Sequence, residues 1–399
     1  MDEPKPVLLH KLEGSTNEIH AAIIIPGENG VISVSADRSV RVWQLRDSGQ
    51  YWPSICHYMG AAATALHYTH ETRNLFVGLD TGSIEEFTLS PDYNRMESVR
   101  VYNAHQNARV CRILVDRENS WLLSGGRDKY FHFHCTVTGK RLGGYQCNAW
   151  CTSLAYDTDA KYAFVGDYSG SITVCKLETS GVKFITSLKG QAGSIRCLAW
   201  DGTKNWLYSG SFDSTVFVWD IAKINLINQI NIKFCSNYFS EMFLPFFRLL
   251  SSGEDGKLVC WDMSLQRLET PDWAESDNCQ LCNRPFFWNM KSMYEQKQIG
   301  LRQHHCRRCG KAICDNCSSK RSILPARGHE YPVRVCENCY INVQPVEKKS
   351  MANFYETRGM VSWMDYDEER KLLLTVSRDN IMKIWNIENI LQVAVYTGP

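Results

Sequence analysis

Strong net charge is absent from this sequence of 399 residues. Forty-four Lys and Arg residues are matched by 43 Asp and Glu residues, which leaves a formal charge of +1. A field of the whole chain that would draw it onto nucleic acid or a membrane is therefore excluded, because such a field depends on a large net charge. Any electrostatic attraction must come from a local cluster.

Long apolar runs are also missing. No uncharged apolar stretch reaches the roughly 18 residues that indicate a spanning helix. The first residues, MDEPKPVLLHKLEG, do not place a basic segment before an apolar one, as a secretory signal does. We therefore expect a cytosolic protein.

A dispersed disulfide framework is lacking, although cysteine is plentiful. Eight of the 17 cysteines fall as four Cys-x-x-Cys pairs between residues 279 and 339. Disulfides need an oxidising compartment, whereas paired cysteines in a cytoplasmic chain are typical of metal sites. The pairs indicate a compact metal-binding module within a much longer chain.

A motif with a period of about 40 residues runs through the rest of the chain. It combines small residues, a turn Asp or Gly and alternating apolar positions, as in SADRSVRVWQL from Ser35 and GSFDSTVFVWDI from Gly210. The alternation and the turn residues predict short antiparallel strands. The position usually held by Trp recurs at Trp43, Phe87, His134, Cys175, Trp219, Trp261 and Trp385. Successive steps are 44, 47, 41, 44, 42 and 124 residues, so the last step contains an insert.

These units resemble WD repeats, which form four-stranded blades of β-propellers. The resemblance implies a mainly β fold, a seven-bladed propeller interrupted between blades six and seven by a small module. Residues 1–270 would form six blades and an N-terminal closing strand, residues 271–345 the module, and residues 346–399 blade seven. Residues 6–14 are expected to close the ring against the last blade, with the tail from Ile390 as a competing strand.

Two details of the repeats stand apart. His105 corresponds to the histidine that opens a WD unit, and we expect it to stabilise its blade through hydrogen bonds to Ser and Asp side chains rather than to act in catalysis. Residues 224–250 fit no blade pattern. A divergent strand pair and a gene-model artefact both stay open for them.

The eight cysteines of the insert have a fixed spacing, with two residues inside each pair and 23, 4 and 18 residues between pairs. Two residues between thiols let both sulfurs of a tight turn reach one tetrahedral Zn²⁺ at about 2.3 Å. Four pairs make two sites, and four protein ligands at each site leave no open position for catalysis. A module of this size buries little apolar surface, so metal must supply folding free energy.

The segments RQHHCRRCG, CDNCSSK and VRVCENC closely resemble the FYVE zinc finger. The resemblance implies two structural Zn²⁺ ions with interleaved ligands, and phosphatidylinositol 3-phosphate as the ligand of the basic motif. The first ion would be held by Cys279, Cys282, Cys314 and Cys317, and the second by Cys306, Cys309, Cys336 and Cys339. Forked arginine donors suit phosphate oxygens.

The resemblance also assigns residues to the lipid headgroup and to the bilayer. The headgroup set is Arg302, Gln303, His304, His305, Arg307, Arg334 and Asp277. Gln303 replaces a basic residue of the family pattern, and Asp277 lies one place beyond the usual offset from Trp273. Ile299 and Leu301 occupy the positions of membrane-inserting residues.

The segment PFFWNMKSMYEQ lies in the long gap between the first two cysteine pairs. It either extends the inserting surface or packs against the propeller. The second interpretation is favoured, because exposed aromatic residues promote aggregation.

The chain as a whole resembles the family of WD-repeat and FYVE-domain-containing endosomal adaptors. This implies a scaffold without enzymatic activity on the cytosolic face of early endosomes, with signalling proteins such as kinases as propeller partners and a homodimer as one possible state. A RING-like ubiquitin ligase is the alternative, although RING ligand sets normally include His and give RQHHCR no role. A zinc-dependent nucleic-acid binder would need an extended basic face, so no nucleic-acid partner is expected.

Overall fold

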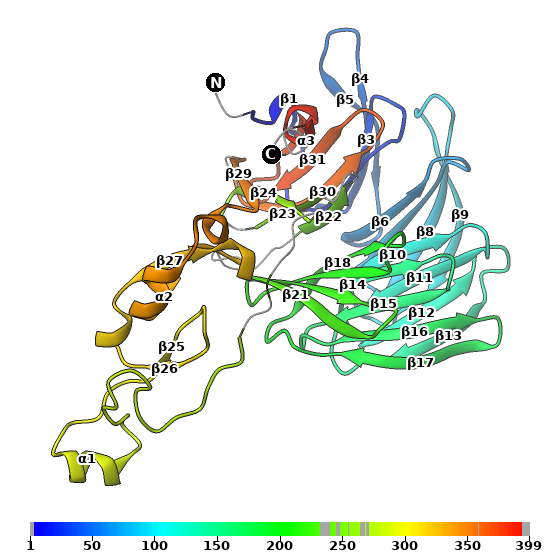
Figure 1. Ribbon diagram of the computed structural model, residues 1–399. Coiled ribbons are helices and arrows are strands. Elements are labelled where there is room, and N and C mark those ends of the chain that lie inside the picture. Colours follow the sequence, from blue (N-terminus) through cyan, green and yellow to red (C-terminus); the bar gives the residue numbers. More distant parts are fainter. Residues whose placement is uncertain are drawn as a thin grey trace.

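The computed structural model describes residues 4–231, 240–244, 248–253, 255–263, 268, 271–357 and 359–392. Most of these residues form a ring of seven four-stranded antiparallel blades, and a small finger projects from the rim of the ring (Figure 1). The predicted seven-bladed propeller with a finger after six repeat units is confirmed.

Blades one to five each use four consecutive strands. Blade one contains β2 (Ile19–Ile24), β3 (Gly30–Ser35), β4 (Ser39–Leu45) and β5 (Tyr51–Tyr58). Blade two contains β6 (Ala63–Thr69), β7 (Asn74–Leu79), β8 (Ser83–Leu89) and β9 (Met96–Asn103). Blade three contains β10 (Val110–Asp116), β11 (Trp121–Gly126), β12 (Tyr130–Cys135) and β13 (Arg141–Gln146). Blade four contains β14 (Cys151–Asp157), β15 (Tyr162–Asp167), β16 (Ile172–Glu178) and β17 (Gly181–Leu188). Blade five contains β18 (Ile195–Asp201), β19 (Trp206–Ser211), β20 (Thr215–Asp220) and β21 (Asn225–Asn231).

Blade six is the one that the finger interrupts. Its first three strands are β22 (Ser240–Leu244), β23 (Arg248–Ser252) and β24 (Lys257–Asp262), and its outer strand, β29 (Ala352–Glu356), follows the finger. A repeat unit of the sequence ends on the third strand of a blade, whereas the outer strand opens the next unit. The predicted assignment of residues 346–399 to blade seven is therefore wrong for residues 352–356, which form the outer strand of blade six.

Blade seven closes the ring with strands from both ends of the chain. Its sheet contains β30 (Val361–Asp367), β31 (Leu372–Ser377), β32 (Met382–Asn386) and β1 (Val7–Leu12). β1 runs antiparallel to β32, from Val7 opposite Asn386 to Leu12 opposite Met382. This confirms the expected closing strand. The competing tail contributes helix α3 (Glu388–Gln392), and residues 393–399 lie outside the described part.

The segment without a blade pattern forms strands of blades five and six. β21 pairs with β20, and β22 pairs with β23. A divergent strand pair is therefore the alternative that the structure supports, while residues 232–239 and 245–247 lie outside the described part.

In four blades the recurring Trp makes the same hydrogen bond, which explains why the repeat keeps this residue. In each, the indole on the third strand donates to a hydroxyl ten residues earlier on the second strand. The pairs are Trp43–Ser33 at 2.9 Å, Trp219–Ser209 at 2.9 Å, Trp261–Ser251 at 2.7 Å and Trp385–Thr375 at 2.9 Å. Each ring is also buried among apolar residues of its own and an adjacent blade, so the position ties neighbouring sheets together.

His105 has the structural role that the sequence predicts. Its buried ring lies 3.0 Å from Ser124 Oγ through Nε2 and 2.9 Å from the Asp128 carboxylate through Nδ1. Gln191 takes the corresponding place in blade five, where Oε1 accepts from Ser209 Oγ at 2.7 Å and Nε2 donates to Thr215 Oγ1 at 3.1 Å. Glutamine can replace histidine there because it also offers one acceptor and one donor.

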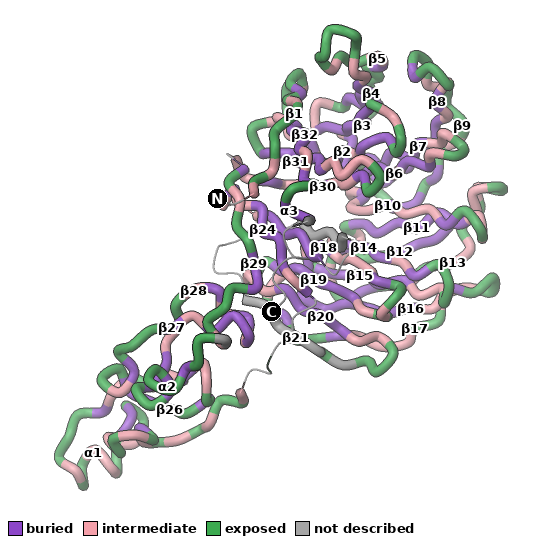
Figure 2. Tube along the Cα trace, turned by 45° about the horizontal axis from the view of Figure 1, so that its top comes forward, coloured by how far each residue is buried: buried purple, intermediate pink, exposed green. Residues whose placement is uncertain are grey.

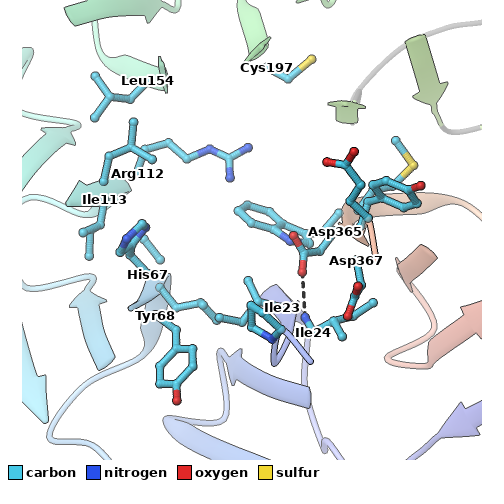
Figure 3. A pocket seen from close by; sticks show the side chains of 18 of the residues that line it. Ile23, Ile24, His67, Tyr68, Arg112, Ile113, Leu154, Cys197, Asp365 and Asp367 are labelled. Atoms are coloured by element: carbon cyan, nitrogen blue, oxygen red, sulfur yellow. Dashed lines mark hydrogen bonds between the residues drawn. The ribbon is translucent and has the colours of Figure 1, made fainter. Parts of the chain in front are cut away.

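The inner strands of the blades surround a central channel with a cavity of about 560 Å³. Figure 3 shows Arg112 and Asp365 entering this cavity from opposite walls. The Asp365 carboxylate accepts a hydrogen bond from the Ile24 backbone N–H at 2.7 Å. Burial nevertheless raises the pKa of Asp365 from 3.8 to about 7, because the channel wall solvates the charged form poorly.

The first prediction concerns His105. Replacing it with alanine leaves Ser124 and Asp128 without their buried partner, so we expect the free energy of unfolding of His105→Ala to fall by about 2 kcal/mol. Urea denaturation followed by tryptophan fluorescence measures the loss. The exposed His57 gives the matched control His57→Ala. Equal stability of the two variants would contradict the role of His105.

The second prediction concerns the pH dependence of stability. The folded chain holds the Asp365 proton up to about pH 7, whereas the unfolded chain releases it near 3.8, so this residue costs stability increasingly as the pH rises between these values. We expect Asp365→Asn to raise the melting temperature at pH 8 by more than at pH 4.5, measured by differential scanning fluorimetry. The exposed Asp47 gives the control Asp47→Asn. The same gain at both pH values would show that ionisation is not the cause.

Candidate metal centre and anion-binding surface

The finger contains little regular structure. Its elements are α1 (Met290–Gln296), β25 (His304–His305), β26 (Ala312–Ile313), η1 (Asn316–Ser318), β27 (Arg321–Leu324), η2 (Pro325–Arg327), β28 (His329–Arg334), α2 (Glu337–Asn342) and η3 (Pro345–Lys348). Its core is small, with Phe286, Ile313, Leu324 and Val335 packed among buried cysteines. So small a core cannot fix the surface by apolar burial alone.

Two groups of four cysteines converge in this core. Cys279, Cys282, Cys314 and Cys317 form one group, and Cys306, Cys309, Cys336 and Cys339 form the other, with all four sulfurs of each group within 4.8 Å of one another. These are the interleaved sets that the FYVE resemblance implies.

The sulfur geometry fits zinc. A tetrahedral ion with Zn–S bonds of about 2.3 Å holds its sulfurs about 3.8 Å apart. Cys282 and Cys314 are 3.7 Å apart in the first group, and Cys309 and Cys336 are 4.0 Å apart in the second. Both distances are far longer than a disulfide bond of about 2.05 Å. Each group can therefore close around one Zn²⁺.

Backbone amides support thiolate at these positions. The amide of Cys314 donates to Cys279 Sγ at 3.4 Å, and that of Cys336 donates to Cys306 Sγ at 3.3 Å. Burial opposes ionisation of Cys279, but backbone N–H donors outweigh it and lower the pKa of this thiol to about 7. The fold thus favours the thiolate at Cys279 and Cys306. Burial raises the pKa of the other four affected ligands, where zinc itself must stabilise the thiolate; these are Cys309, Cys314, Cys317 and Cys339.

Trp273 organises one side of the basic motif. The His305 ring stacks on the indole with centroids 4.9 Å apart and planes 10° apart, while His305 Nε2 lies 3.1 Å from the Ala274 carbonyl. The Arg307 guanidinium lies 4.6 Å from the Trp273 ring. Stacking fixes the position of Arg307 without using its N–H donors, which stay available for an anion.

Asp315 organises the other side. Its carboxylate accepts from Arg334 at 2.7 Å and lies 3.0 Å from His304 Nε2. The Arg307 amide donates to the Arg334 carbonyl at 3.0 Å, which brings the two arginines together. Burial and the charge of Arg334 lower the pKa of Arg307, as expected for neighbouring cations. Asp315 is not among the residues predicted from the sequence, although its place directly after the zinc ligand Cys314 is a signal that points to it.

The remaining members of the predicted headgroup set differ in position. Arg302 is exposed and makes no hydrogen bond or ion pair with another described residue, and Gln303 next to it is half-buried. The Asp277 carboxylate accepts from the Trp288 indole at 2.9 Å, and no contact within the described structure joins it to the basic residues. Arg308, in contrast, holds Glu347 with two donors at 2.9 and 3.1 Å and is part of the fold.

The predicted inserting residues are not equivalent. The side chain of Ile299 is 80% exposed, whereas Leu301 is half-buried against the finger core. Phe287, whose amide donates to the Leu301 carbonyl, is exposed as well.

The favoured interpretation of PFFWNMKSMYEQ is wrong. Phe286 is fully buried in the core of the finger itself, and Phe287, Trp288, Met290 and Tyr294 are exposed. Helix α1 lies at the end of the finger far from the propeller in both Figure 1 and Figure 2. The segment cannot pack on the propeller from there, so it extends the apolar surface around Ile299.

Specific contacts attach the other end of the finger to the propeller. β28 pairs with β21 at His329 and Asn231, and the Glu330 carboxylate accepts from the Met351 amide at 2.9 Å and from Ser350 Oγ at 2.8 Å. The Tyr331 and Phe354 rings lie 5.6 Å apart. The finger is therefore anchored to the rim at blades five and six.

Within the described residues, none of the helices has the length and hydropathy needed to cross a bilayer.

Comparison with protein families supports both parts of this structure. Residues 270–345 match the FYVE zinc finger, and residues 6–44, 96–134 and 182–220 match the WD domain, G-beta repeat. A fold comparison finds the WD40 β-propeller domain of Doa1, with a TM-score of 0.63 and 15% identity over 97% of this chain and 98% of that one. Because residues 270–345 match the FYVE zinc finger and contain two Cys₄ groups, the finger binds two zinc ions.

Relatives with both parts match almost the entire chain. WD repeat and FYVE domain-containing protein 1 of Mus musculus is 44% identical over 99% of this chain and 96% of its own length. WD repeat and FYVE domain-containing protein 2 of Homo sapiens is 44% identical over 97% of both chains, and that of Caenorhabditis elegans is 35% identical over 98% of this chain and 94% of its own. The chain belongs to the family of WD repeat and FYVE domain-containing proteins.

Proposed function

We propose that this protein is an adaptor that binds phosphatidylinositol 3-phosphate on the cytosolic face of early endosomes and presents its propeller to signalling or trafficking proteins. One observation carries the proposal. Arg307 and Arg334 lie together beside a Cys₄ zinc group, with the exposed Arg302 and two histidines in the same motif. Guanidinium donors fixed in advance lose little entropy when they bind a phosphate.

Placement rather than bulk charge favours this ligand. The finger has 11 Lys and Arg residues and 7 Asp and Glu residues between positions 271 and 345. Two Cys₄ zinc groups carry a formal charge of −2 each, which offsets that excess. Electrostatic attraction of the finger to an acidic surface in general is therefore weak. Recognition depends on the cationic cup, the surface formed by Arg302, Arg307 and Arg334.

The apolar end of the finger supports attachment to a bilayer. Exposed Ile299 and Tyr294 line a common depression beside α1, and the anchored end of the finger lies on the propeller rim. The finger can reach into a membrane while the propeller stays in water.

The rival functions find less support. Both zinc groups of the finger consist of cysteine alone, which differs from the mixed Cys and His set of a RING finger. The cations of the basic motif form one compact group, whereas a nucleic-acid binder needs an extended basic face. We therefore infer a scaffold without enzymatic activity. A homodimer would strengthen a weak headgroup contact through effective concentration.

The third prediction tests the phosphate contact. Arg307→Ala removes donors that have no carboxylate partner in the described structure, so we expect at least a tenfold loss of binding to vesicles with phosphatidylinositol 3-phosphate. Vesicle flotation across the phosphoinositide isomers measures the effect.

Two controls make this test specific. The exposed Arg95 lies on blade two of the propeller, outside the finger, so Arg95→Ala should bind as the unchanged protein does. Zinc content measured by atomic spectroscopy should stay at two ions in both variants. Equal flotation of the unchanged, zinc-loaded protein with and without the 3-phosphate lipid would refute the proposed function.

The fourth prediction tests insertion into the bilayer. Each CH₂ group that enters the bilayer contributes about 0.8 kcal/mol, so Ile299→Ser should weaken vesicle binding by about tenfold or more. Binding of the soluble dibutanoyl form of the lipid, followed by calorimetry, should not change. Ile341, which is 72% exposed on α2, gives the matched control Ile341→Ser. A similar loss in both variants would show that the effect is not specific to the tip.

A further inference from the structure

One mouth of the propeller channel is unusually basic. A cavity of about 310 Å³ opens where the inner strands begin, and four arginines line it with Glu18 as the single acidic residue in the lining. The arginines are Arg109, Arg112, Arg127 and Arg196. The opposite mouth is acidic, with Asp365, Asp367, Glu368 and Glu369 in its lining. An anion would therefore be drawn to the basic mouth only.

The topology explains why the arginines meet. Arg109 and Arg112 stand just before and within β10, and Arg196 stands near the start of β18. Arg127 follows β11, in the turn beside the start of β10. Inner strands of a propeller all begin at the same end of the ring, so residues of blades three and five converge there. Sequence positions nearly 90 residues apart contribute to one pocket.

Aromatic rings hold the cations in place. The guanidinium of Arg112 lies 4.0 Å from the Trp363 ring, that of Arg127 lies 5.5 Å from Trp150, and that of Arg196 lies 5.8 Å from Phe212. A ring face attracts a cation but leaves its N–H donors at the edge. Arg112 and Arg127 are thus positioned by ring faces that leave their N–H donors able to reach a ligand.

Arg112 is the deepest of these cations. It also lines the larger cavity of the channel, and Figure 3 shows its guanidinium reaching toward the centre. No hydrogen bond or ion pair joins its side chain to another described residue. Burial lowers the pKa of Arg112 to about 10, so it remains a cation at neutral pH. Arg112 is half-buried, and a cation removed from bulk water without an anionic partner is disfavoured unless a ligand or water hydrogen-bonds to it.

Apart from the four arginines, no described residue that lines this pocket is positively charged at physiological pH. Burial and the charges of Arg109 and Arg127 lower the pKa of His20 to about 4, which keeps this lining residue neutral at physiological pH. The positive field thus comes from arginine, the side chain best suited to phosphate.

We propose that this mouth of the channel binds a phosphoserine or phosphothreonine side chain of a partner protein. Three arginine charges in excess of Glu18 exceed what one carboxylate would neutralise, whereas a phosphate brings nearly two negative charges and three acceptor oxygens. The site is recessed between blades, so a side chain on a flexible segment can enter it. A lipid headgroup in a bilayer plane cannot easily do so.

The opening of the pocket presents aromatic side chains that suit contact with the residues on either side of a phosphorylated side chain. Trp150 is 45% exposed and Tyr168 is 57% exposed, and their rings lie 5.7 Å apart beside the opening. Exposed aromatic residues next to a charged recess are typical of protein-binding hot spots. This pocket gives the propeller of the proposed adaptor a defined class of partner, although it does not depend on lipid binding by the finger.

The fifth prediction tests the pocket in the full-length protein. The probes are fluorescent peptides with a central phosphoserine or phosphothreonine and randomised neighbours, compared by anisotropy with the same peptides carrying serine, threonine or glutamate. We expect binding of the phosphorylated set only. Arg112→Gln and Arg127→Gln should each weaken it by about tenfold or more, as expected for a lost hydrogen bond to a charged group.

Matched controls separate the pocket from folding and from the finger. Arg127 is exposed, so Arg127→Gln keeps the test valid even if Arg112→Gln unfolds, and Arg95→Gln changes an exposed arginine on another blade. Arg307→Ala should lose vesicle binding but keep peptide binding, which distinguishes failure of this proposal from failure of the proposed function. Equal binding of phosphorylated and unphosphorylated peptides would overturn the proposal, as would binding of inositol hexakisphosphate or orthophosphate without the phosphopeptides.

Discussion

Coordination of two zinc ions by eight thiolates is the constraint on which the finger depends. Apart from the metal, the finger has only a small apolar core, short strands of two to six residues, two short α-helices and a few ion pairs to stabilise it. Cys306 lies inside the basic motif and Cys314 lies beside Asp315, so the ions also fix the residues that flank them. Loss of metal would therefore remove the fold and the arrangement of cations together, because both rest on the same bonds.

The propeller supplies a different kind of rigidity. β1 pairs with β32 and supplies the outer strand of blade seven, so strands from the two chain ends share one sheet and close the ring. Indole-to-hydroxyl hydrogen bonds repeat in four blades, and His105 and Gln191 make equivalent contacts in two. The finger is inserted between strands of blade six and touches blade five, so its anchored end moves with the ring.

The finger and the propeller are each rigid, so each can hold its own proposed binding site. Under the proposals made above, the tip of the finger and its cationic cup meet the membrane, while the basic mouth of the channel receives a phosphorylated partner. Both sites use aromatic rings to hold guanidinium groups, Trp273 for Arg307 and Trp363 for Arg112. The same physical device therefore serves two anion sites, because a ring fixes a cation without occupying its donors.

The sequence by itself determined the repeat number, the zinc ligands and the basic motif. These features depend on local spacing: a period of about 40 residues for blades, and two residues between thiols for zinc. Spacing also sufficed for the closing strand and for His105. It could not place Asp277, Leu301 or the segment around Phe287, because burial of a side chain depends on neighbours that the local pattern does not contain. Only the tertiary structure decided that the Trp288 indole donates a hydrogen bond to the Asp277 carboxylate and that α1 lies away from the propeller. It also decided that arginines of blades three and five line one pocket. Their convergence follows from ring closure, which no single repeat can specify.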